Sequence, residues 1–328
     1  MKSRLSIIVL PLALCAISAS LCGCAGMAAS AEEYYSIGMA YYELGKYAEA
    51  EKWLNRAKQA KNTMVASAYN LGRISFEMER YEEAAKYFES VLKRDKDNVP
   101  ALKAAAYSRI RADDIKKAEK HYSRLLELVP ESADSGYNHA LILFALKRYK
   151  ESEAVLEKYP IALQENKDVM LLYARNQGAQ NKVEAIETYS NFLANHTDGK
   201  ARYEYAGLLE KNELYARAIE EYKKSLTETA NDSIDPLKSD IRFALARALL
   251  IADSSNSEGI TELQGAVNDG YKNIAEIEKL SGKISAVNRE AFNNLIKSMR
   301  DKEAEAKAKV KAKTEESAEV NAESETNP

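Results

Sequence analysis

Small and bulky apolar residues recur along the chain at an interval of 34 positions, as from 50 to 84, 118 and 152. Two registers with this period hold small residues, namely Gly38, Gly72, Ala106 and Ala140, and Ala50, Ala84, Ala118 and Ser152. Two others hold mostly bulky residues, namely Tyr47, Tyr81, Ile115 and Tyr149, and Leu54, Phe88, Tyr122 and Leu156. A period of this length predicts a chain of repeated units that stack on one another to bury a shared core.

The small and bulky positions have complementary roles within one unit. Gly38 and Ala50 would let the two helices of the first unit approach closely, and Tyr47 and Leu54 would fill the seam between them. Most of the 20 tyrosines are therefore expected to be core residues.

The pattern resembles the tetratricopeptide repeat, and the motif can be followed from unit to unit. The first two units carry it as Tyr34-x-x-Ile37-Gly38-x-x-Tyr41, Ala50 and Ala57, and as Leu71-Gly72, Tyr81, Ala84 and Phe88. The third ends on Pro130, the fourth covers about 133–160, and two more are marked by Ala185 and Tyr189, and by Tyr215, Ala218 and Tyr222. A divergent pair of helices, near 241–250 and 259–267, would form a seventh unit. The resemblance covers residues 31–268 and implies an all-α, right-handed superhelical solenoid of six to seven stacked antiparallel helix pairs.

Two closing helices are expected after the repeats, near 273–280 and 285–299, so that residues 269–300 cap the last hydrophobic face. Residues 301–328 form a charged tail rich in Ala, Lys and Glu. Its first half could continue a helix. From Thr314 to Pro328 the tail holds acids, no base and almost no apolar side chain, so disorder is expected there.

The N-terminal segment reads as an export signal. Lys2 and Arg4 precede an apolar run from Leu5 to Ala19, which is short for a membrane span. The stretch Leu21-Cys22-Gly23-Cys24 then resembles the lipobox of bacterial lipoproteins. That resemblance implies removal of residues 1–23, acylation of Cys24 with fatty acids such as palmitate, and a lipid-anchored tether over 24–30. An ordinary signal peptide or an uncleaved anchor are the alternatives. In many such lipoproteins, alanine after the acylated Cys directs the protein to the outer membrane, so Ala25 favours that location. The repeats would then face the periplasm or the cell surface.

Composition narrows the class of protein further. The chain has 47 Lys and Arg against 50 Asp and Glu, a net charge of −3 that argues against nucleic acid as a partner. All three Cys belong to the N-terminal export segment, the last being Cys24, and the three His (121, 139 and 196) are scattered. His139 falls at an inward position and is expected in the core. The chain lacks phosphate-loop, HExxH and Gly-x-Ser-x-Gly motifs. We therefore expect no enzyme activity, no cofactor and no metal.

A binding face is implied by the family resemblance. In tetratricopeptide repeats, positions 5, 9 and 12 of the first helix of each unit line the concave groove, and the spacing puts them on one helix face. Here they are Tyr35, Met39, Tyr42, Tyr69, Arg73, Phe76, Lys103, Tyr107, Ile110, Tyr137, Leu141 and Phe144, with Tyr203 in the sixth unit. Aromatic residues there favour a surface that binds protein or peptide partners. The alternative is that neighbouring helices, or the chain's own terminus, cover these rings.

Within the second unit, Tyr69 and Phe76 are expected to point into the groove, whereas Leu71, Gly72 and Ala84 serve packing. Some tetratricopeptide domains use this groove to clamp the carboxylate terminus of heat-shock chaperones. That activity is not expected here, because only Asn70 matches their pattern of clamp residues.

These patterns together predict a non-enzymatic scaffold that is anchored to the bacterial cell envelope and binds protein or peptide partners. Outer-membrane assembly, secretion and pilus biogenesis are roles that envelope proteins with such repeats suggest. A surface-exposed adhesin and a periplasmic carrier that delivers a small ligand to a transporter remain alternatives.

Overall fold

A computed structural model describes residues 30–230 and 235–325 of the chain, and every regular element in these ranges is a helix. The chain divides into two compact units, the first ending at Lys147 and the second beginning at Arg148. Within each unit, consecutive helices pack in antiparallel pairs and each pair packs on the next. The prediction of an all-α solenoid of stacked helix pairs is confirmed.

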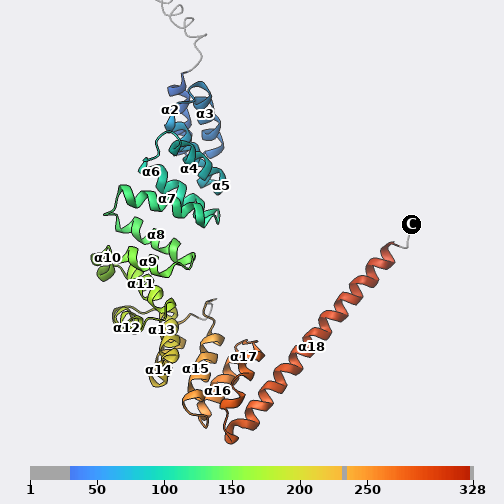
Figure 1. The fold of residues 1–328 in the computed structure, drawn as a ribbon. Coiled ribbons are helices and arrows are strands. Elements are labelled where there is room, and N and C mark those ends of the chain that lie inside the picture. The colour runs from blue at the N-terminus through green and yellow to red at the C-terminus, as the bar shows by residue number, and fades with distance from the viewer. Residues whose placement is uncertain (1–29, 231–234, 326–328) are drawn as a thin grey trace, which may run out of the picture. The chain divides into compact units, whose positions relative to one another are not determined.

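The first unit contains seven of the described helices (Figure 1). They are α2 (Ala31–Glu43), α3 (Tyr47–Ala60), α4 (Val65–Glu77), α5 (Tyr81–Leu92), α6 (Val99–Arg111), α7 (Ile115–Leu128) and α8 (Ala133–Ala145). Even-numbered helices here are the first helices of the repeats, so α2, α4, α6 and α8 carry the predicted groove positions.

The second unit holds the remaining described helices. They are α9 (Tyr149–Leu156), α10 (Pro160–Glu165), α11 (Lys167–Ala179), α12 (Ala185–Asn195), α13 (Gly199–Lys211), α14 (Tyr215–Glu228), α15 (Lys238–Ala252), α16 (Ser257–Asn268), α17 (Ile274–Glu278), η1 (Ser281–Lys283) and α18 (Ala286–Glu325). The expected seventh pair corresponds to α15 and α16, which pack closely on each other.

Short polar side chains begin many of these helices. The N-cap side chains that accept a first-turn N–H belong to Ser30, Asn98, Asp114, Ser132, Asn166, Asp198, Asn256 and Asn273. Ser30 and Glu33 form a reciprocal capping box at α2. Each such cap satisfies donors that have no partner within the helix.

The turn inside each of the first six repeats places one residue on left-handed backbone. These residues are Gly45, Glu79, Asp113, Lys147, Asn181 and Glu213, with φ between 57° and 70°. Each lies just before the second helix of its repeat. Their spacing equals the period of the sequence from Gly45 to Asn181 and is slightly shorter from there to Glu213, so the backbone itself repeats with the sequence.

Glycine and alanine occupy the positions where the two helices of a repeat cross. A Cβ atom added to Gly38 would lie 2.8 Å from Leu54 Cγ, and one added to Gly72 would lie 2.8 Å from Phe88 Cε1. The register of small residues that includes Ala50, Ala84 and Ala118 is fully buried at these three positions. The roles assigned to the small and bulky positions from their period are confirmed.

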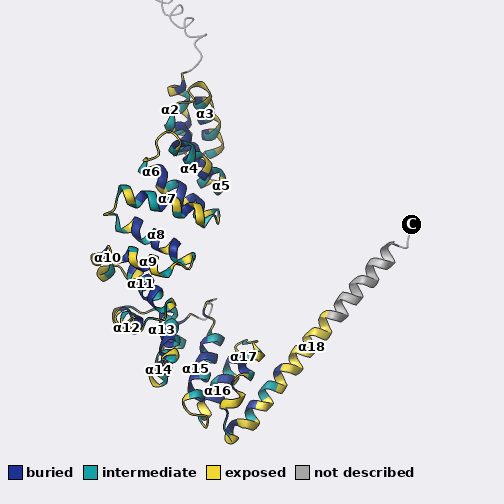
Figure 2. Cartoon of the chain, viewed as in Figure 1, coloured by how far each residue is buried: buried dark blue, intermediate teal, exposed yellow. Residues whose placement is uncertain are grey.

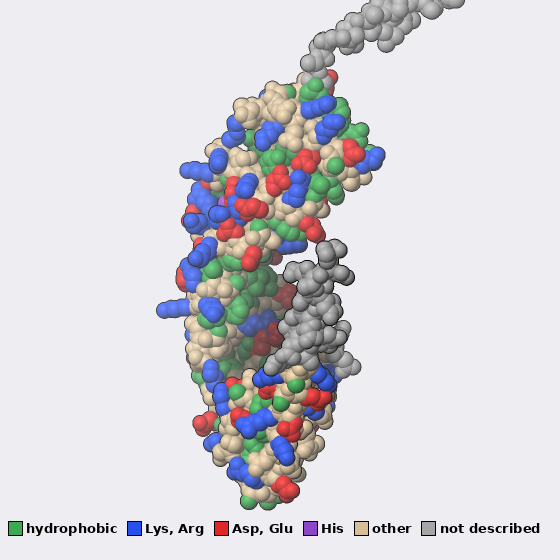
Figure 3. Space-filling model, turned by 90° about the vertical axis from the view of Figure 1, so that its right-hand side faces the viewer, with side chains coloured by type: hydrophobic (Ala, Val, Ile, Leu, Met, Phe, Trp, Pro, Cys, Tyr) green, Lys and Arg blue, Asp and Glu red, His purple; other side chains and the backbone are tan. Residues whose placement is uncertain are grey.

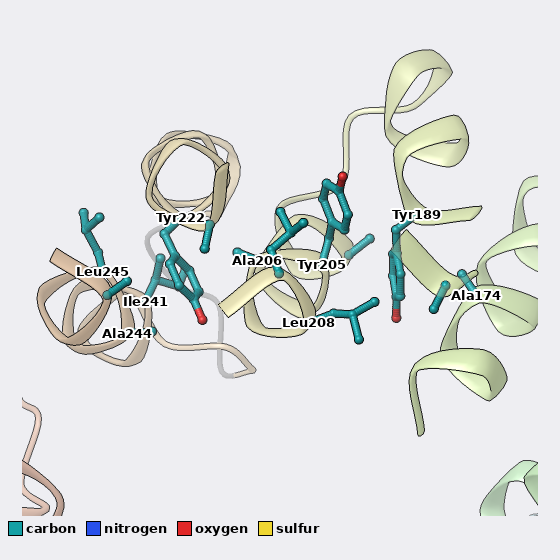
Figure 4. Packing of buried hydrophobic residues seen from close by; sticks show 14 of the residues in the cluster. Ala174, Tyr189, Tyr205, Ala206, Leu208, Tyr222, Ile241, Ala244 and Leu245 are labelled. Atoms are coloured by element: carbon teal, nitrogen blue, oxygen red, sulfur yellow. The ribbon is translucent and has the colours of Figure 1, made fainter. Parts of the chain in front are cut away.

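Tyrosines contribute much of the core of the second unit. Tyr189, Tyr205 and Tyr222 lie buried among alanine and aliphatic side chains of α11 to α15, including Ile241 and Leu245 (Figure 4). A separate cluster joins α15 and α16 to α17 and the first turns of α18 through Leu263, Ile277, Phe292 and Met299. Side chains of α17 and of the first turns of α18 therefore pack against α15 and α16.

Helix α18 continues to Glu325, through the segment for which the sequence predicts disorder. Residues 301–310 are all exposed (Figure 2). Glu303 pairs with Lys307 and Glu305 with Lys309, each at 2.6 Å and one helical turn apart. Such pairs, together with the high helix propensity of Ala, Glu and Lys, account for a helix with little to bury.

The predicted signal peptide, the acylated Cys24 and tether residues 24–29 lie outside the described residues, as do residues 326–328. None of the described helices is both long enough and apolar enough to span a membrane.

Candidate functional site

The predicted groove residues of α2, α4 and α6 contact one another from repeat to repeat. Asn70 Nδ2 donates to the Tyr35 hydroxyl at 3.0 Å, and Arg73 Nη2 donates to the Tyr42 hydroxyl at 2.9 Å, which joins α4 to α2. The rings of Phe76 and Tyr107 lie 5.3 Å apart, which joins α4 to α6. The first helices of three repeats therefore present one continuous layer, which we call the aromatic face and which comprises Tyr35, Met39, Tyr42, Tyr69, Arg73, Phe76 and Tyr107.

The half of the aromatic face on α2 and α4 is held by its own polar groups. The Arg73 guanidinium lies 4.5 Å from the centre of the Tyr42 ring, and its Nη1 donates to Asn70 Oδ1 at 3.1 Å. Asn70 is only 5% exposed. Because these donors and acceptors satisfy one another, the side chains of this half are fixed before any partner arrives.

The half of the aromatic face on α4 and α6 is more open. Tyr107 is 49% exposed although its ring packs against the ring of Phe76. Phe76 also meets the edge of Tyr81, with ring centres 5.1 Å apart. The Arg111 guanidinium lies 4.3 Å from the centre of the Tyr81 ring and donates to the Tyr81 hydroxyl. Lys103 is exposed one helical turn before Tyr107. An accessible ring thus stands between two cations. Figure 3 shows green hydrophobic side chains gathered in patches over the N-terminal part of the chain, among charged ones.

Tyr69 and Phe76 do not belong to the groove alone, which corrects the simple division between groove and packing residues. The Tyr69 ring meets the buried Phe88 edge-on, with centres 5.2 Å apart. Tyr69 and Phe76 both pack against the cluster that contains Ala84, Phe88 and Ala105. A first helix is narrow enough for one large ring to reach both the groove and the seam. Loss of these two rings would therefore weaken the stack as well as the face.

The other predicted groove residues lie outside the aromatic face. Tyr137 and Phe144 are half-buried on α8, and Leu141 is exposed between them. Tyr203 belongs to the second unit, where its ring centre lies 5.8 Å from that of Tyr222 and burial raises the pKa of its hydroxyl. The structure thus brings the groove residues of three successive repeats together in one layer.

The three histidines of the described residues each contact a different neighbour. His121 Nε2 lies 3.3 Å from Glu89, and the buried His139 lies 3.6 Å from Glu119. The imidazole of His196 packs on Phe192. Within residues 30–230 and 235–325, no group of three or more His, Cys, Asp or Glu side chains is arranged to hold a metal ion.

One buried ion cluster escaped the sequence analysis. The Arg109 side chain is 3% exposed and donates to both oxygens of Glu89 at 2.7 Å and to Glu82 at 2.6 Å. Burial alone would raise the pKa of Glu89, but hydrogen bonds from Arg109 and His121 outweigh it and hold the pKa below its ordinary value. The Glu82 side chain remains half-exposed although it accepts from the buried Arg109. The cluster joins α5 to α6 and serves the scaffold.

A cavity of about 350 Å³ lies in the second unit between the end of α16 and α18. Val267, Tyr271, Ile274 and Met299 are among its lining residues. Burial, followed by the nearby charge of Glu276, raises the pKa of Tyr271 to about 12, so this phenol stays neutral. This is the feature most relevant to the alternative of a small-ligand carrier, since such volumes suit small molecules.

Comparison with known families supports the repeat assignment. Models of the tetratricopeptide repeat match residues 75–134 and 177–233, and the model for anaphase-promoting complex, cyclosome, subunit 3 matches residues 16–91. Comparison with curated proteins gives no match.

Solved structures of low sequence identity are similar to this chain over much of their own length. A tetratricopeptide repeat protein from Parabacteroides merdae is 19% identical, with a TM-score of 0.52 over 82% of this chain and 98% of that one. MamA from Desulfovibrio magneticus is also 19% identical, with a TM-score of 0.48 over 52% and 97%. YrrB, described as a repeat protein with an unusual peptide-binding site, is 16% identical, with a TM-score of 0.47 over 57% and 93%. The matched segments, the period of the sequence and the packed helix pairs together show that the chain contains tetratricopeptide repeats.

Proposed function

We propose that this protein is a non-enzymatic scaffold that binds a protein or peptide partner on the aromatic face. Repeats of this family generally serve as scaffolds rather than as enzymes. The observation that carries the proposal is Tyr107, an aromatic side chain left half-exposed on a face whose other side chains hold one another in place. Burying such a ring in a complex gains contact area at little entropic cost.

The charge around Tyr107 favours a partner with acidic residues. Lys103 and Arg111 flank the ring on α6, and no carboxylate of the described residues forms an ion pair with either within 4.0 Å. A partner segment that lays an apolar or aromatic side chain on Tyr107 and Phe76, with a carboxylate one turn away, would match this surface.

Anchoring at the cell envelope is the second part of the proposal and rests on the sequence of residues 1–24. Lys2 and Arg4, the apolar run and Leu21-Cys22-Gly23-Cys24 support acylation of Cys24 after export. A partner held on the aromatic face would then be kept close to the membrane. Outer-membrane assembly, secretion and pilus biogenesis are the processes in which such a scaffold would serve.

Substitution of Tyr107 by alanine tests the binding site. We expect Tyr107→Ala to reduce crosslinked partner recovered from intact cells about thirtyfold, since truncating a hot-spot residue commonly costs about 2 kcal/mol of binding free energy. The measurement is quantitative mass spectrometry of the crosslinked complex, with circular dichroism to follow helicity. Val183→Ala, which trims another exposed apolar side chain in the second unit, is the control and should keep full recovery. Unchanged recovery with Tyr107→Ala would refute the aromatic face as the binding site.

A further inference from the structure

Another cavity, of about 450 Å³, belongs to the first unit. It lies between the turn that follows α3 and the end of α5. It is distinct from the aromatic face and shares no residue with it. Three basic side chains line it, Lys58, Lys93 and Arg94, together with the polar side chains of Asn62 and Ser90. No acidic residue contributes to the lining.

The three cations in this cavity lack acidic partners. Among the described residues, no carboxylate lies within 4.0 Å of Lys58, Lys93 or Arg94, whereas Arg80, Arg109 and Arg124 of the same unit each pair with an acid. Lys58 Nζ rests 4.9 Å from the centre of the Tyr87 ring, and Arg94 Nη2 donates to the Asn62 carbonyl at 3.2 Å. Three like charges that face one hollow without compensation attract an anion.

The N-terminus of α4 adds to this positive potential, and the nearest acid in sequence has other hydrogen-bond partners. Asp95 follows Arg94 in sequence, but its carboxylate accepts from Asn98 Nδ2 at 3.0 Å and from the Asp97 N–H at 3.3 Å, so it is engaged with the start of α6. Val65, the first residue of α4, lines the cavity. No side chain caps α4, and no acid lies in its first turn, so the positive end of the helix adds to the charge of the three side chains.

The position of the cavity indicates the source of the anion. Lys61, in the turn after α3, pairs with Glu32 in the first turn of α2 at 2.8 Å. The cavity therefore lies at the end of the first repeat where the chain enters α2 from the tether. From Cys24 to Ala31 the chain extends at most about 25 Å at roughly 3.5 Å per residue. A protein acylated at Cys24 would hold this end of the repeat near the lipid headgroups.

We propose that this cavity binds the phosphate of a membrane lipid headgroup and so orients the first repeat against the bilayer. Lysine and arginine donate charge-assisted hydrogen bonds to phosphate oxygens, and each basic side chain near an anionic surface adds to the attraction. This inference rests on the proposed lipid anchor for the identity of the ligand, but the cavity and its charges are independent of acylation.

Short-chain lipids allow the cavity to be tested in solution. The full chain in neutral detergent is titrated by calorimetry with dihexanoyl phosphatidylglycerol, dihexanoyl phosphatidylcholine and inorganic phosphate. We expect phosphatidylglycerol to bind and phosphatidylcholine and inorganic phosphate to bind far more weakly. In the variant Lys58→Gln/Lys93→Gln/Arg94→Gln the Kd for phosphatidylglycerol should rise about tenfold or more.

The control variant Lys116→Gln/Lys120→Gln/Lys150→Gln removes three exposed charges elsewhere and should change this Kd less than about twofold. Equal weakening in the two triple variants would overturn the site. Inorganic phosphate binding as tightly as phosphatidylglycerol would overturn the lipid as the ligand. The single change Lys93→Gln at an exposed side chain should give a smaller loss in the same direction, with an unchanged melting curve. The assay needs neither acylation nor a protein partner, so its failure is separate from failure of the proposed function.

Discussion

At the scale of single residues, the turns inside the repeats hold side chains on backbone that favours glycine. Gly45 occupies this place in the first repeat with φ of 70°, whereas Glu79 and Asp113 occupy it in the next two with φ of 58° and 60°. In this region Cβ crowds the following carbonyl oxygen, at a cost of about 1 kcal/mol. The comparison is direct, because the period of the sequence makes Gly45 and Glu79 equivalent positions.

Glycine at position 79 should therefore stabilise the protein. We expect Glu79→Gly to raise the free energy of unfolding by up to about 1 kcal/mol, since the strain is relieved and the exposed Glu79 side chain contributes little. The measurement is urea denaturation followed by circular dichroism. The control, Glu77→Gly, places glycine in the last turn of α4 on right-handed backbone and should lower the stability. A loss of stability at position 79 would show that the turn gains nothing from glycine.

At the scale of helices, stability depends on the close crossing inside each pair. Ala84 is fully buried on α5 and packs with Phe88 and with Ala105 of α6. We expect Ala84→Leu to lower the free energy of unfolding by about 1–3 kcal/mol, because the extra carbons have no space in a close-packed seam. The matched control is Ala48→Leu, an exposed alanine on α3, which should leave the melting temperature nearly unchanged. Equal melting temperatures for the two variants would contradict the assigned crossing.

The limits of sequence reasoning are clearest at the same scale. The period of the sequence identified the seams because each helix must present small residues where its partner crosses. It did not identify the burial of Arg109, whose partner Glu89 lies 20 residues away on α5. The equivalent residues, Ser75 and Leu143, are buried, so a charged side chain in that register was the available signal. A period predicts which positions are buried, but the partner of a buried charge depends on side-chain reach across helices.

At the scale of the whole molecule, two features differ from the sequence-based expectation for physical reasons. The chain divides between Lys147 and Arg148, inside the fourth predicted repeat, although Tyr149 and Ser152 keep the repeat register, because a continuous sequence period carries no signal for such a division. Helix α18 also runs far beyond the packed residues of its first turns. Its scarcity of bulky apolar residues from Thr314 onward predicts disorder, but the Ala and Glu residues of that stretch also favour a solvated helix.

Anchoring at Cys24 would determine where the repeat array and its partner meet. We expect Cys24→Ala to move the protein from the detergent-soluble membrane fraction to the soluble periplasmic or secreted fraction, because a thioether-linked diacyl group cannot form and each buried methylene contributes about 0.8 kcal/mol to membrane binding. Fractionation and immunoblotting provide the measurement. Cys22→Ala is the matched control, since lipoboxes commonly hold alanine at that place, and it should leave the protein in the membrane. If Cys24→Ala stayed membrane-bound to the same extent as the wild type, the apolar segment before it would be an uncleaved anchor. If Cys24→Ala became soluble while Cys22→Ala stayed in the membrane fraction, membrane attachment would instead be assigned to the Cys24 thiol.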